Sequence, residues 1–317
     1  MQPEFEKELW EIKEKKDKLL GLYRLGKEEV LSEIKELRRK FREKAKKLYK
    51  NLSPWDRVTI ARHPKRPHTS DYIKFLIKDF KEIHGDNCFG EDKAVIAGFG
   101  YLGNMPVAVV GHEKGKDTKE KIERNFGMPH PEGYRKAIKV FKLAERFKTP
   151  VITFIDTPGA FPGIGAEERG QSRAIAESMY VMAFLRVPSV AVIIGEGGSG
   201  GALAFGIANR VYMLENAYYS VISPEGCAAI LWKDQRKVKD AAKALKLTAK
   251  DLKELGVIDG IIPEPFGAAH WSPKATAMIL GKYIKSCLKE LCNKTADELV
   301  KERMEKFRKM GVFRSDS

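Results

Sequence analysis

Two glycine-dense turns, each directly after an apolar run with strand character, constrain this chain more than any other feature. The first turn, Asp156 to Gly163, follows the run 151–155, and the second, Gly195 to Gly201, follows the run 189–194. Gly200 and Gly201 offer only backbone, and the residues after them have helical character, so we expect their N–H groups at a helix N-terminus. That geometry is typical of an anion or oxyanion site.

The second turn also matches a different motif. Gly195, Gly197 and Gly200 have the spacing of the dinucleotide-binding fingerprint, and Glu215 falls near the position of a ribose-binding carboxylate. A nicotinamide-dependent oxidoreductase is therefore one interpretation. It leaves a third turn, Ser223 to Gly226, unexplained, since this turn again leads from a strand into a helical run. Three strand–turn–helix units predict a repeated superhelix with one active-site edge.

The turns and several other segments carry a resemblance to a known family. In order along the chain, they resemble the biotin-dependent carboxyltransferases of the crotonase superfamily, and within these the alpha subunits of bacterial acetyl-coenzyme A carboxylases. The resemblance covers roughly residues 30 to 290. Besides the three turns, the matching segments are Ala61–Pro67, Gly111–Gly115, Arg124–Pro129, Pro131–Lys136 and Ile261–Pro265.

The resemblance implies an α/β fold of the crotonase-like (ClpP/crotonase) type, a ββα superhelix. Apolar residues at steps of three and four predict a long amphipathic helix over residues 28–52, and a shorter helical pattern precedes it. We therefore expect an N-terminal helical arm over 1–52, a carboxyltransferase domain over 53–294, and a C-terminal helix and tail over 295–317. The arm either packs on its own domain or clasps a partner.

Within the domain, periodicity and turn signals predict a small set of elements. Gly103 and Asn104 indicate a hairpin, and Thr295 with Glu298 forms a capping box. The stretch 112–134 is too long for an ordinary connector and predicts a functional loop. Helices are expected over 133–148, 167–185 and 273–291.

The resemblance also implies a reaction. The carboxyl group of carboxybiotin, on a separate biotin carboxyl carrier protein, would pass to acetyl-coenzyme A and form malonyl-coenzyme A for fatty acid biosynthesis. Gly200 and Gly201 would supply the backbone oxyanion hole for the biotin ureido oxygen. A beta subunit with a zinc ribbon would bind acetyl-coenzyme A, so activity would need that subunit, in an α2β2 heterotetramer working with biotin carboxylase. Another short acyl-coenzyme A as acceptor is the alternative.

Further site residues are expected around the turns. The candidates for substrate binding are Gly159, Ala160, Gly197, Gly198, Arg124 and Arg135. The two arginines are the best candidates for contacting anionic groups, and a solvated surface role is equally compatible with them. His112 is either an acid or base or, more simply, a hydrogen-bonded structural residue, and the role of Lys114 stays open.

Composition limits the remaining classes. The chain has 317 residues, 43% of them hydrophobic, which suffices for one large α/β domain with extensions. Its formal net charge of +15 fits either a solvated lysine- and glutamate-rich surface or attraction to acidic partners. A basic RNA-binding or scaffold protein would interleave aromatic residues with lysine and arginine. The arm has few aromatics, at core-like positions, so nucleic acid binding is not expected.

The four cysteines, Cys88, Cys227, Cys287 and Cys292, lack the paired spacing of a zinc ribbon. We therefore expect reduced thiols and no metal in this chain. The first seven residues already include the charged Glu4, Glu6 and Lys7, and no apolar stretch reaches the length that crosses a bilayer. These features predict a cytoplasmic protein without membrane association.

Overall fold

The computed structural model describes residues 3–312, and their strands form a single mixed sheet. The strand order is β1-β2-β3-β4-β5-β6-β8, and β7 pairs with the carboxyl end of β5, at Glu196 to Gly198. The strands are β1 (Ile77–Glu82), β2 (Val95–Leu102), β3 (Met105–His112), β4 (Val151–Thr157), β5 (Ser189–Gly198), β6 (Arg210–Leu214), β7 (Tyr218–Ser220) and β8 (Gly260–Ile262).

The sheet changes from antiparallel to parallel pairing at β3. The strands β1, β2 and β3 are antiparallel, and the turn between β2 and β3 lies at Gly103, where a φ of +68° suits glycine. From β3 onward all pairs are parallel. Every residue of β4 and β5 is buried, as expected for central strands covered on both faces. The predicted hairpin is confirmed.

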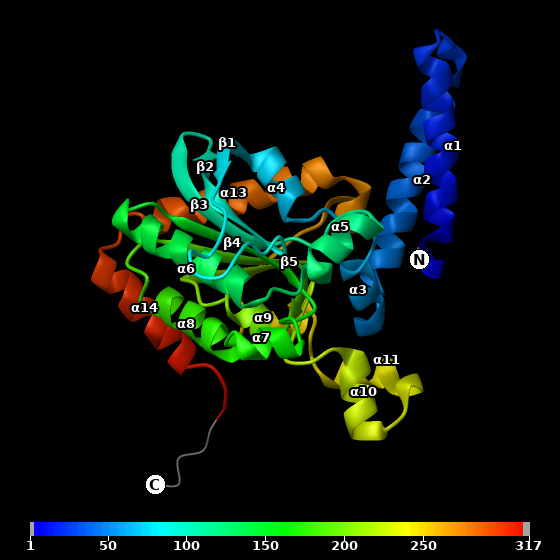
Figure 1. Ribbon diagram of the computed structural model, residues 1–317. Helices are drawn as coiled ribbons and strands as arrows, with labels where there is room; N and C mark the ends of the chain where they lie inside the picture. The colour runs from blue at the N-terminus through cyan, green and yellow to red at the C-terminus, as the bar shows by residue number, and fades with distance from the viewer. Residues whose placement is uncertain (1–2, 313–317) are drawn as a thin grey trace.

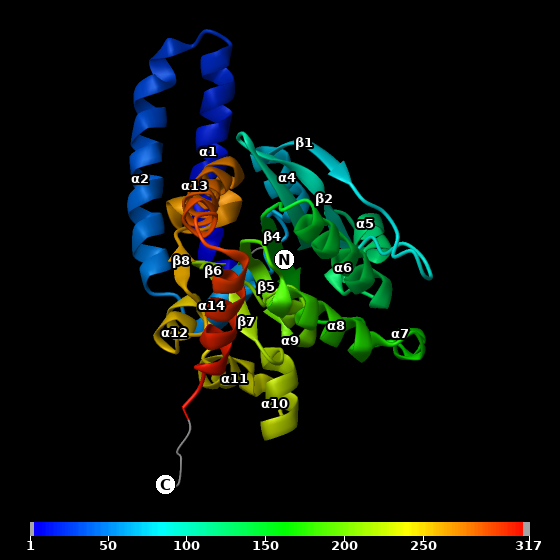
Figure 2. The ribbon, with the colours of Figure 1, turned by 90° about the vertical axis from the view of Figure 1, so that its left-hand side faces the viewer.

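Helices cover both faces of the sheet (Figures 1 and 2). On one face α6 (Pro131–Arg146) packs beside α8 (Gln171–Phe184), and on the other α4 (Thr69–Leu76) packs beside α13 (Pro273–Leu291). The apolar side of α6 is continuous with the main core, which explains its amphipathic pattern. The helix predicted over 273–291 is confirmed.

The N-terminal arm is an antiparallel helical hairpin that projects from the sheet domain (Figures 1 and 2). It consists of α1 (Lys7–Arg24) and α2 (Leu31–Lys50), which turn at Gly26. At the base of the hairpin an apolar cluster joins the arm to the domain, with Leu9, Ala45, Tyr49, Ile60 and Ala268 at its centre. The base of the arm therefore packs on its own chain.

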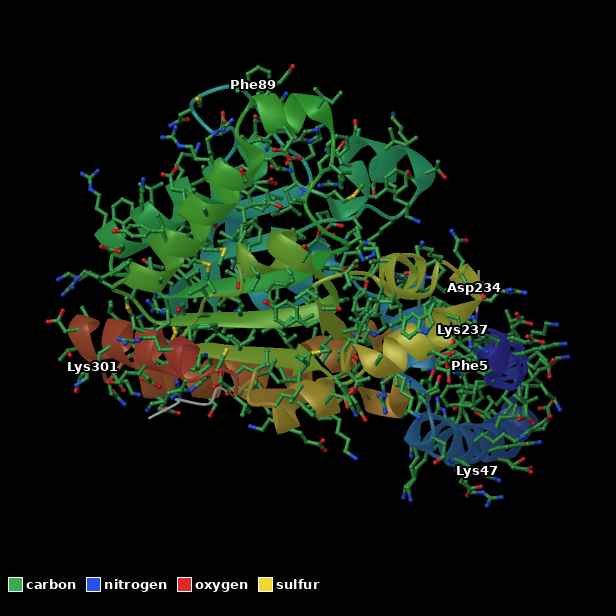
Figure 3. All side chains as sticks on the ribbon, turned by 90° about the horizontal axis from the view of Figure 1, so that it is seen from below. Phe5, Lys47, Phe89, Asp234, Lys237 and Lys301 are labelled. Carbon is green, nitrogen blue, oxygen red and sulfur yellow. The ribbon has the colours of Figure 1, made fainter. Side chains whose placement is uncertain are left out.

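Short helices surround the carboxyl ends of β4 and β5. They are α3 (Pro54–Ala61), α5 (Thr118–Glu123), α7 (Ile164–Glu168), α9 (Ser199–Leu203), α10 (Pro224–Trp232), α11 (Val238–Ala244) and α12 (Ala249–Glu254). Short 3-10 turns lie at Glu4–Glu6, Glu28–Val30, Asn125–Gly127, Gln235–Lys237, Pro265–Gly267 and Ala269–Trp271. In Figure 3, α10 and α11 lie on the same side of the molecule as the arm.

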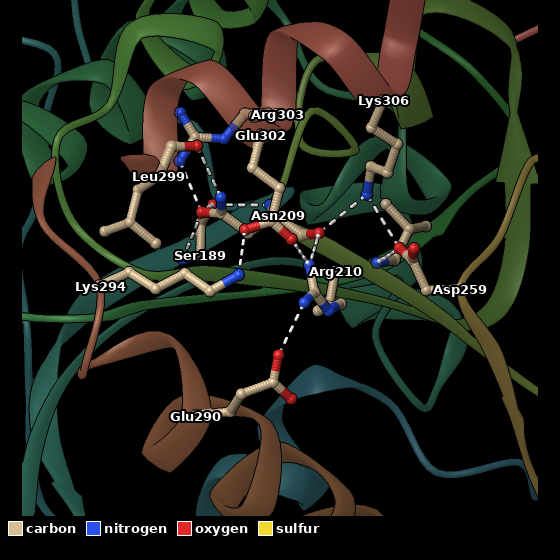
Figure 4. Close-up of polar contacts among 11 residues, drawn as sticks. Ser189, Asn209, Arg210, Asp259, Glu290, Lys294, Leu299, Glu302, Arg303 and Lys306 are labelled. Carbon is tan, nitrogen blue, oxygen red and sulfur yellow. Dashed lines mark hydrogen bonds and ion pairs between the residues drawn. The ribbon is translucent and has the colours of Figure 1, made fainter. Parts of the chain in front are cut away.

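The last helix, α14 (Ala296–Arg308), is fixed to the sheet domain by a polar network (Figure 4). Arg303 is 1% exposed and donates hydrogen bonds to the carbonyls of Ala183 and Leu185 and to Oδ1 of Asn209. The Thr295 capping box is present, as predicted. The C-terminal helix is therefore held by buried polar contacts as well as by apolar packing.

Three expectations need correction. The helix expected over 167–185 is two helices, α7 and α8, because Gly170 adopts a φ of +82° between them. The stretch 112–134 is not an open loop, since it holds α5 and the start of α6. The first four residues of the second glycine turn belong to β5, so the turn itself begins only at Ser199.

Among the described residues, no helix is both long and apolar enough to cross a membrane.

Candidate active site

The two glycine turns touch each other at the carboxyl edge of β4 and β5. A Cβ on Gly201 would lie 2.7 Å from the carbonyl carbon of Gly159 and 2.8 Å from the nitrogen of Ala160. A Cβ on Gly198 would collide with the carbonyl of Pro158. Only glycine permits this approach, so the glycines of the second turn keep the two turns in contact.

Gly200 and Gly201 lie in the first turn of α9, as the sequence predicted. N–H groups in the first turn of a helix have no partner within the helix. Among the described residues, no loop carbonyl or side chain accepts a hydrogen bond from either group. Ser199, which opens the helix, has a φ of +50°, an uncommon value for a residue other than glycine. The site therefore has two unpartnered backbone donors beside a strained turn.

Gly200 lies in the wall of a cavity that is largely apolar, whereas Gly201 is buried and does not line it. This cavity has a volume of about 320 Å³, and Ser199, Gly200, Leu203 and Tyr219 are among the residues that line it. A Cβ on Gly200 would make only ordinary contact with Ile175, at 3.7 Å, so this glycine is not required by protein packing. A second apolar cavity of about 550 Å³ shares the walls at Leu203, Tyr219 and Val257. Together they can take a small uncharged ring next to backbone donors.

A buried cluster of charges lies behind the turns. Lys114 Nζ is 2.7 Å from Oδ1 of Asp156 and 2.5 Å from Oε2 of Glu196. Burial opposes ionisation of Glu196, but the charges of Lys114 and Arg62 outweigh it and hold its pKa at about 2. Burial likewise opposes the charge of Lys114, and the two carboxylates overcome it and raise its pKa. Lys114 and Glu196 are therefore both charged.

Arg62 extends the cluster to the third turn. Its Nε donates to Oε1 of Glu196 at 2.6 Å, and its Nη1 donates to Oε1 of Glu225 at 2.5 Å. Tyr218 also donates its hydroxyl hydrogen to Oε1 of Glu196, at 2.7 Å. One set of hydrogen bonds thus connects α3, β4, β5, β7 and the start of α10.

His112 lies under the second turn, not in the cavity. Its ring is fully buried and packs against Phe205 at a centroid distance of 4.5 Å. Burial lowers the pKa of His112 to about 3, and the charge of Lys114 acts in the same direction. The backbone of Gly201 and Phe154 favours the protonated ring but does not reverse the shift. A neutral, enclosed ring fits a structural role, although neither ring nitrogen makes the hydrogen bond that this role was expected to involve.

The two predicted arginines bind groups of the protein itself in the structure, and their substrate contacts stay predictions. Arg135 donates to Oδ2 of Asp86, to Oε1 of Glu132 and to the carbonyl of Arg169, and Arg124 donates to the carbonyl of Lys93. Neither lines the cavities beside Gly200.

The other predicted substrate-binding residues serve the turns themselves. The N–H group of Gly159 already donates to Oγ1 of Thr157, and Ala160 packs against the core. Gly197 pairs with Thr157 and Tyr219 inside the sheet, and Gly198 closes the contact with Pro158. Their substrate contacts stay predictions.

Comparison with known proteins decides the family. Residues 2–311 match the family described as acetyl co-enzyme A carboxylase carboxyltransferase-like. The chain is 79% identical to the acetyl-coenzyme A carboxylase carboxyl transferase subunit alpha of Aquifex aeolicus, over 99% of this chain and 97% of that protein. It is 54% identical to the same subunit of a Geobacillus species, over 98% of this chain and 95% of that protein. The chain belongs to the acetyl-coenzyme A carboxylase carboxyltransferase alpha family.

Solved structures show the same fold at low identity. A transcarboxylase 12S structure has a TM-score of 0.60 and 19% identity, covering 74% of this chain and 44% of that one. A Pseudomonas malonate decarboxylase hetero-tetramer has a TM-score of 0.56 and 17% identity, covering 68% of this chain and 86% of that one. These neighbours have the crotonase-like fold, so the predicted fold class is confirmed. As a member of the carboxyltransferase alpha family, the chain is a subunit of a multi-subunit, biotin-dependent carboxylase.

The dinucleotide interpretation fails on geometry as well as on family. Gly195 and Gly197 lie inside β5, not in a phosphate-binding loop, and a Cβ on Gly195 would collide with Asp156. Glu215 accepts a hydrogen bond from the N–H of Glu264, and burial raises its pKa. The fingerprint spacing arises here from glycines that admit close packing.

Sequence reasoning missed the buried charge cluster and one further polar cluster. Lys114, Asp156 and Glu196 are far apart in the chain, and only the family resemblance of Gly111–Gly115 pointed to Lys114.

The other cluster joins Glu6, His63 and His270, whose potential ligand atoms lie within 4.8 Å of one another, as in a metal site. However, Nδ1 of His63 accepts a hydrogen bond from the N–H of Lys65, which places the ring proton on Nε2, facing Glu6.

This hydrogen bond makes the Glu6 cluster a poor metal site. A metal-bound imidazole nitrogen carries no proton, and the other ring nitrogen then usually donates a hydrogen bond. The rings of His63 and His270 also stack, with centroids 3.9 Å apart and planes at 16°, so one ion cannot lie in both ring planes. Tyr49 donates its hydroxyl hydrogen to Glu6. The arrangement fits a carboxylate that anchors the arm.

The four cysteines are free thiols, with Cys227 and Cys287 buried.

Proposed function

We propose that this chain supplies one half of a carboxyltransferase active site, in which the N–H groups of Gly200 and Gly201 bind an oxygen that gains negative charge. The observation that carries the proposal is the pair of unpartnered donors in the first turn of α9, with Gly200 in the wall of the cavity of about 320 Å³. No side-chain nucleophile is required for this role. Preorganised donors act where charge develops, and each contributes about 3 kcal/mol to transition-state stabilisation.

The substrates follow from family membership. Carboxybiotin, presented on a biotin carboxyl carrier protein, would supply the carboxyl group and gain charge at its ureido oxygen as that group leaves. The apolar walls at Leu203 and Tyr219 would exclude water and orient the ring. The acceptor would be acetyl-coenzyme A and the product malonyl-coenzyme A, for fatty acid biosynthesis.

The second half of the site would come from a partner. We propose that a beta subunit, with a zinc ribbon and the acetyl-coenzyme A site, joins this chain in an α2β2 heterotetramer in the cytoplasm, with biotin carboxylase supplying carboxybiotin. Exposed apolar side chains near the carboxyl edge of the sheet, including Val221, Ile230 and Leu231, offer surface for such a contact. The surplus of positive charge would favour acidic partners, including coenzyme A phosphates and an acidic carrier protein.

Reconstitution tests this proposal. The purified chain is assayed with malonyl-coenzyme A and biocytin, alone and with its beta partner, and we expect turnover only in the complex. Full turnover by the isolated chain would defeat the shared-site model. Parallel assays with other short acyl-coenzyme A substrates test the alternative acceptor, which a preference of the complex for a longer acyl chain would support.

A further inference from the structure

Lys114 lies where both glycine turns begin. It follows the end of β3, and its ammonium group bridges Asp156, near the end of β4, and Glu196, near the end of β5. The side chain of Lys114 is only 13% exposed. Oδ1 of Asp156 also accepts a hydrogen bond from the N–H of Glu196 at 2.9 Å. The bridge therefore spans the two strands immediately before they enter the turns.

Glycines pack against the bridge, whose three residues also line a cavity of about 280 Å³. A Cβ on Gly127 would lie 2.6 Å from Cγ of Lys114, and a Cβ on Gly195 would collide with Asp156. Glycines on separate segments thus pack against the lysine stem and the aspartate. These contacts hold the ammonium group between the strands.

We propose that Lys114 is a positioning residue, which sets the spacing of the two glycine turns and so aims the Gly200 and Gly201 N–H groups into the cavity. The proposal rests on the proposed function of those two donors. Lys114 lines a separate cavity together with Asp156 and Glu196 and does not line the cavities beside Gly200, so it acts on those donors through the two carboxylates. A displacement of about 1 Å at a catalytic group can lower turnover on the order of a hundredfold.

Removing the lysine charge would leave two buried carboxylates facing each other. Like charges in a shared buried site raise the pKa of the pair, so the pair takes up a proton at low pH. That proton can replace the lysine as the bridge, and the bridge is lost as the pH rises through the raised pKa. The other polar groups around the cluster are Arg62, Tyr218, Glu225, His63, His68 and Lys121, and the charges of Asp156 and Lys114 also act on Arg66, Tyr72 and His112.

Four variants of the reconstituted complex test the proposal. Lys114→Met removes the charge, and Lys114→Arg keeps it. Lys114→Met combined with Asp156→Asn relieves the repulsion and keeps an oxygen that can accept from the N–H of Glu196. Lys116→Met is the matched control, because Lys116 pairs with Asp71 at an exposed position two residues away.

We expect Lys114→Met to lower kcat at least tenfold, with KM for malonyl-coenzyme A within about twofold, and to make kcat fall as the pH rises from about 6 to 9. Lys114→Arg and the double variant should each recover most of the lost kcat with a flat pH profile. Lys116→Met should match the wild type. An assembled Lys114→Met complex with wild-type kcat and pH profile would overturn the proposal. So would a double variant that recovers nothing or fails to assemble.

Hydrogen–deuterium exchange of the chain separates this inference from the proposed function. We expect peptides over 157–163 and 198–204 to exchange faster in Lys114→Met and at the wild-type rate in Lys116→Met. Unchanged exchange in Lys114→Met contradicts the positioning role, even if turnover falls. Faster exchange together with no carboxyl transfer by the wild-type complex would contradict the proposed function alone.

Discussion

Gly201 packs against Gly159 so closely that a Cβ at position 201 would lie 2.7 Å from the Gly159 carbonyl carbon, whereas Gly200 has ordinary space around it. The two neighbouring glycines therefore have different reasons to be glycine. Gly201 keeps the two glycine turns in contact, and Gly200 keeps space free in the cavity of about 320 Å³.

This difference gives the first prediction. Gly201→Ala should destabilise the chain by about 1–3 kcal/mol, because backbone must shift to admit the methyl group. Gly200→Ala should unfold at the wild-type urea concentration and still lose turnover by about tenfold or more in the reconstituted complex, because the methyl group enters the cavity. Gly90→Ala is the control, since a Cβ there meets nothing within 4 Å. Normal turnover of Gly200→Ala would remove this residue from the proposed site.

The second prediction concerns the strained backbone at Ser199. Ser199→Gly should increase stability by about 1 kcal/mol, because glycine adopts a φ of +50° without strain. We expect lower turnover at the same time, because a flexible turn holds the donors less firmly. Lys233→Gly provides the comparison, with a similar φ of +52° at the end of α10, and should stabilise without changing turnover. A Ser199→Gly complex with full turnover would show that the strain has no part in the site.

The third prediction concerns the buried Arg303 in Figure 4. Arg303→Met would leave the carbonyls of Ala183 and Leu185 without the arginine donor, while Oδ1 of Asn209 would keep only its hydrogen bonds from Ser189. We expect a loss of about 3 kcal/mol or more in urea unfolding, because each unsatisfied buried acceptor costs about 1–3 kcal/mol. Lys301→Met, on the exposed side of the same helix, should change stability by less than about 0.5 kcal/mol. Equal stability of the two variants would contradict the anchoring role of Arg303.

The fourth prediction is an acid sensitivity that depends on His112. Burial lowers the pKa of His112 to about 3, while the unfolded chain binds the same proton near pH 6.5. The unfolded state therefore binds more protons over this range, and stability must fall as the pH drops from about 6.5 toward 3. We expect His112→Gln to reduce this slope by about 1.4 kcal/mol per pH unit, measured by urea unfolding at several pH values. An unchanged slope would mean that His112 titrates normally in the folded chain.

The fifth prediction concerns metal. Because the His63 ring presents a proton to Glu6, the isolated chain should hold no stoichiometric zinc after dialysis against excess Zn²⁺ and then buffer. Elemental analysis measures the ratio. One tightly bound zinc per chain, lost in Glu6→Gln, would show that the two imidazoles turn to bind an ion.

Local signals in the sequence predicted a good part of this structure. The bounds of α13, the Thr295 capping box and the hairpin at Gly103 follow from apolar periodicity and turn chemistry, which act over a few residues. The break at Gly170 was missed because one glycine within a helical pattern does not reveal its φ. The division into an arm, a transferase domain and a C-terminal segment stays a prediction.

The site was predictable only in part for the same reason. Glycines at a strand end indicated backbone donors. They did not show that Gly201 is needed for packing between the turns or that Gly200 leaves space in the cavity. The Lys114 bridge depends on how β3, β4 and β5 lie side by side, which no local pattern encodes. Glu6 entered the sequence analysis only as part of the charged start of the chain, and only the fold shows that it is buried.

The buried Glu6 carboxylate gives the arm the mechanics of a lever. The hairpin is held at its base by Glu6, Tyr49 and their neighbours, while the turn at Leu25, 81% exposed, lies at the distant end. With 18 residues in α1, that end stands roughly 27 Å from the pivot, at 1.5 Å per residue. A rotation of a few degrees at the base therefore moves the tip by ångströms. A partner bound at the tip could in this way displace the segment that carries Arg62 and His63. That segment lies beside the charges that support the glycine turns.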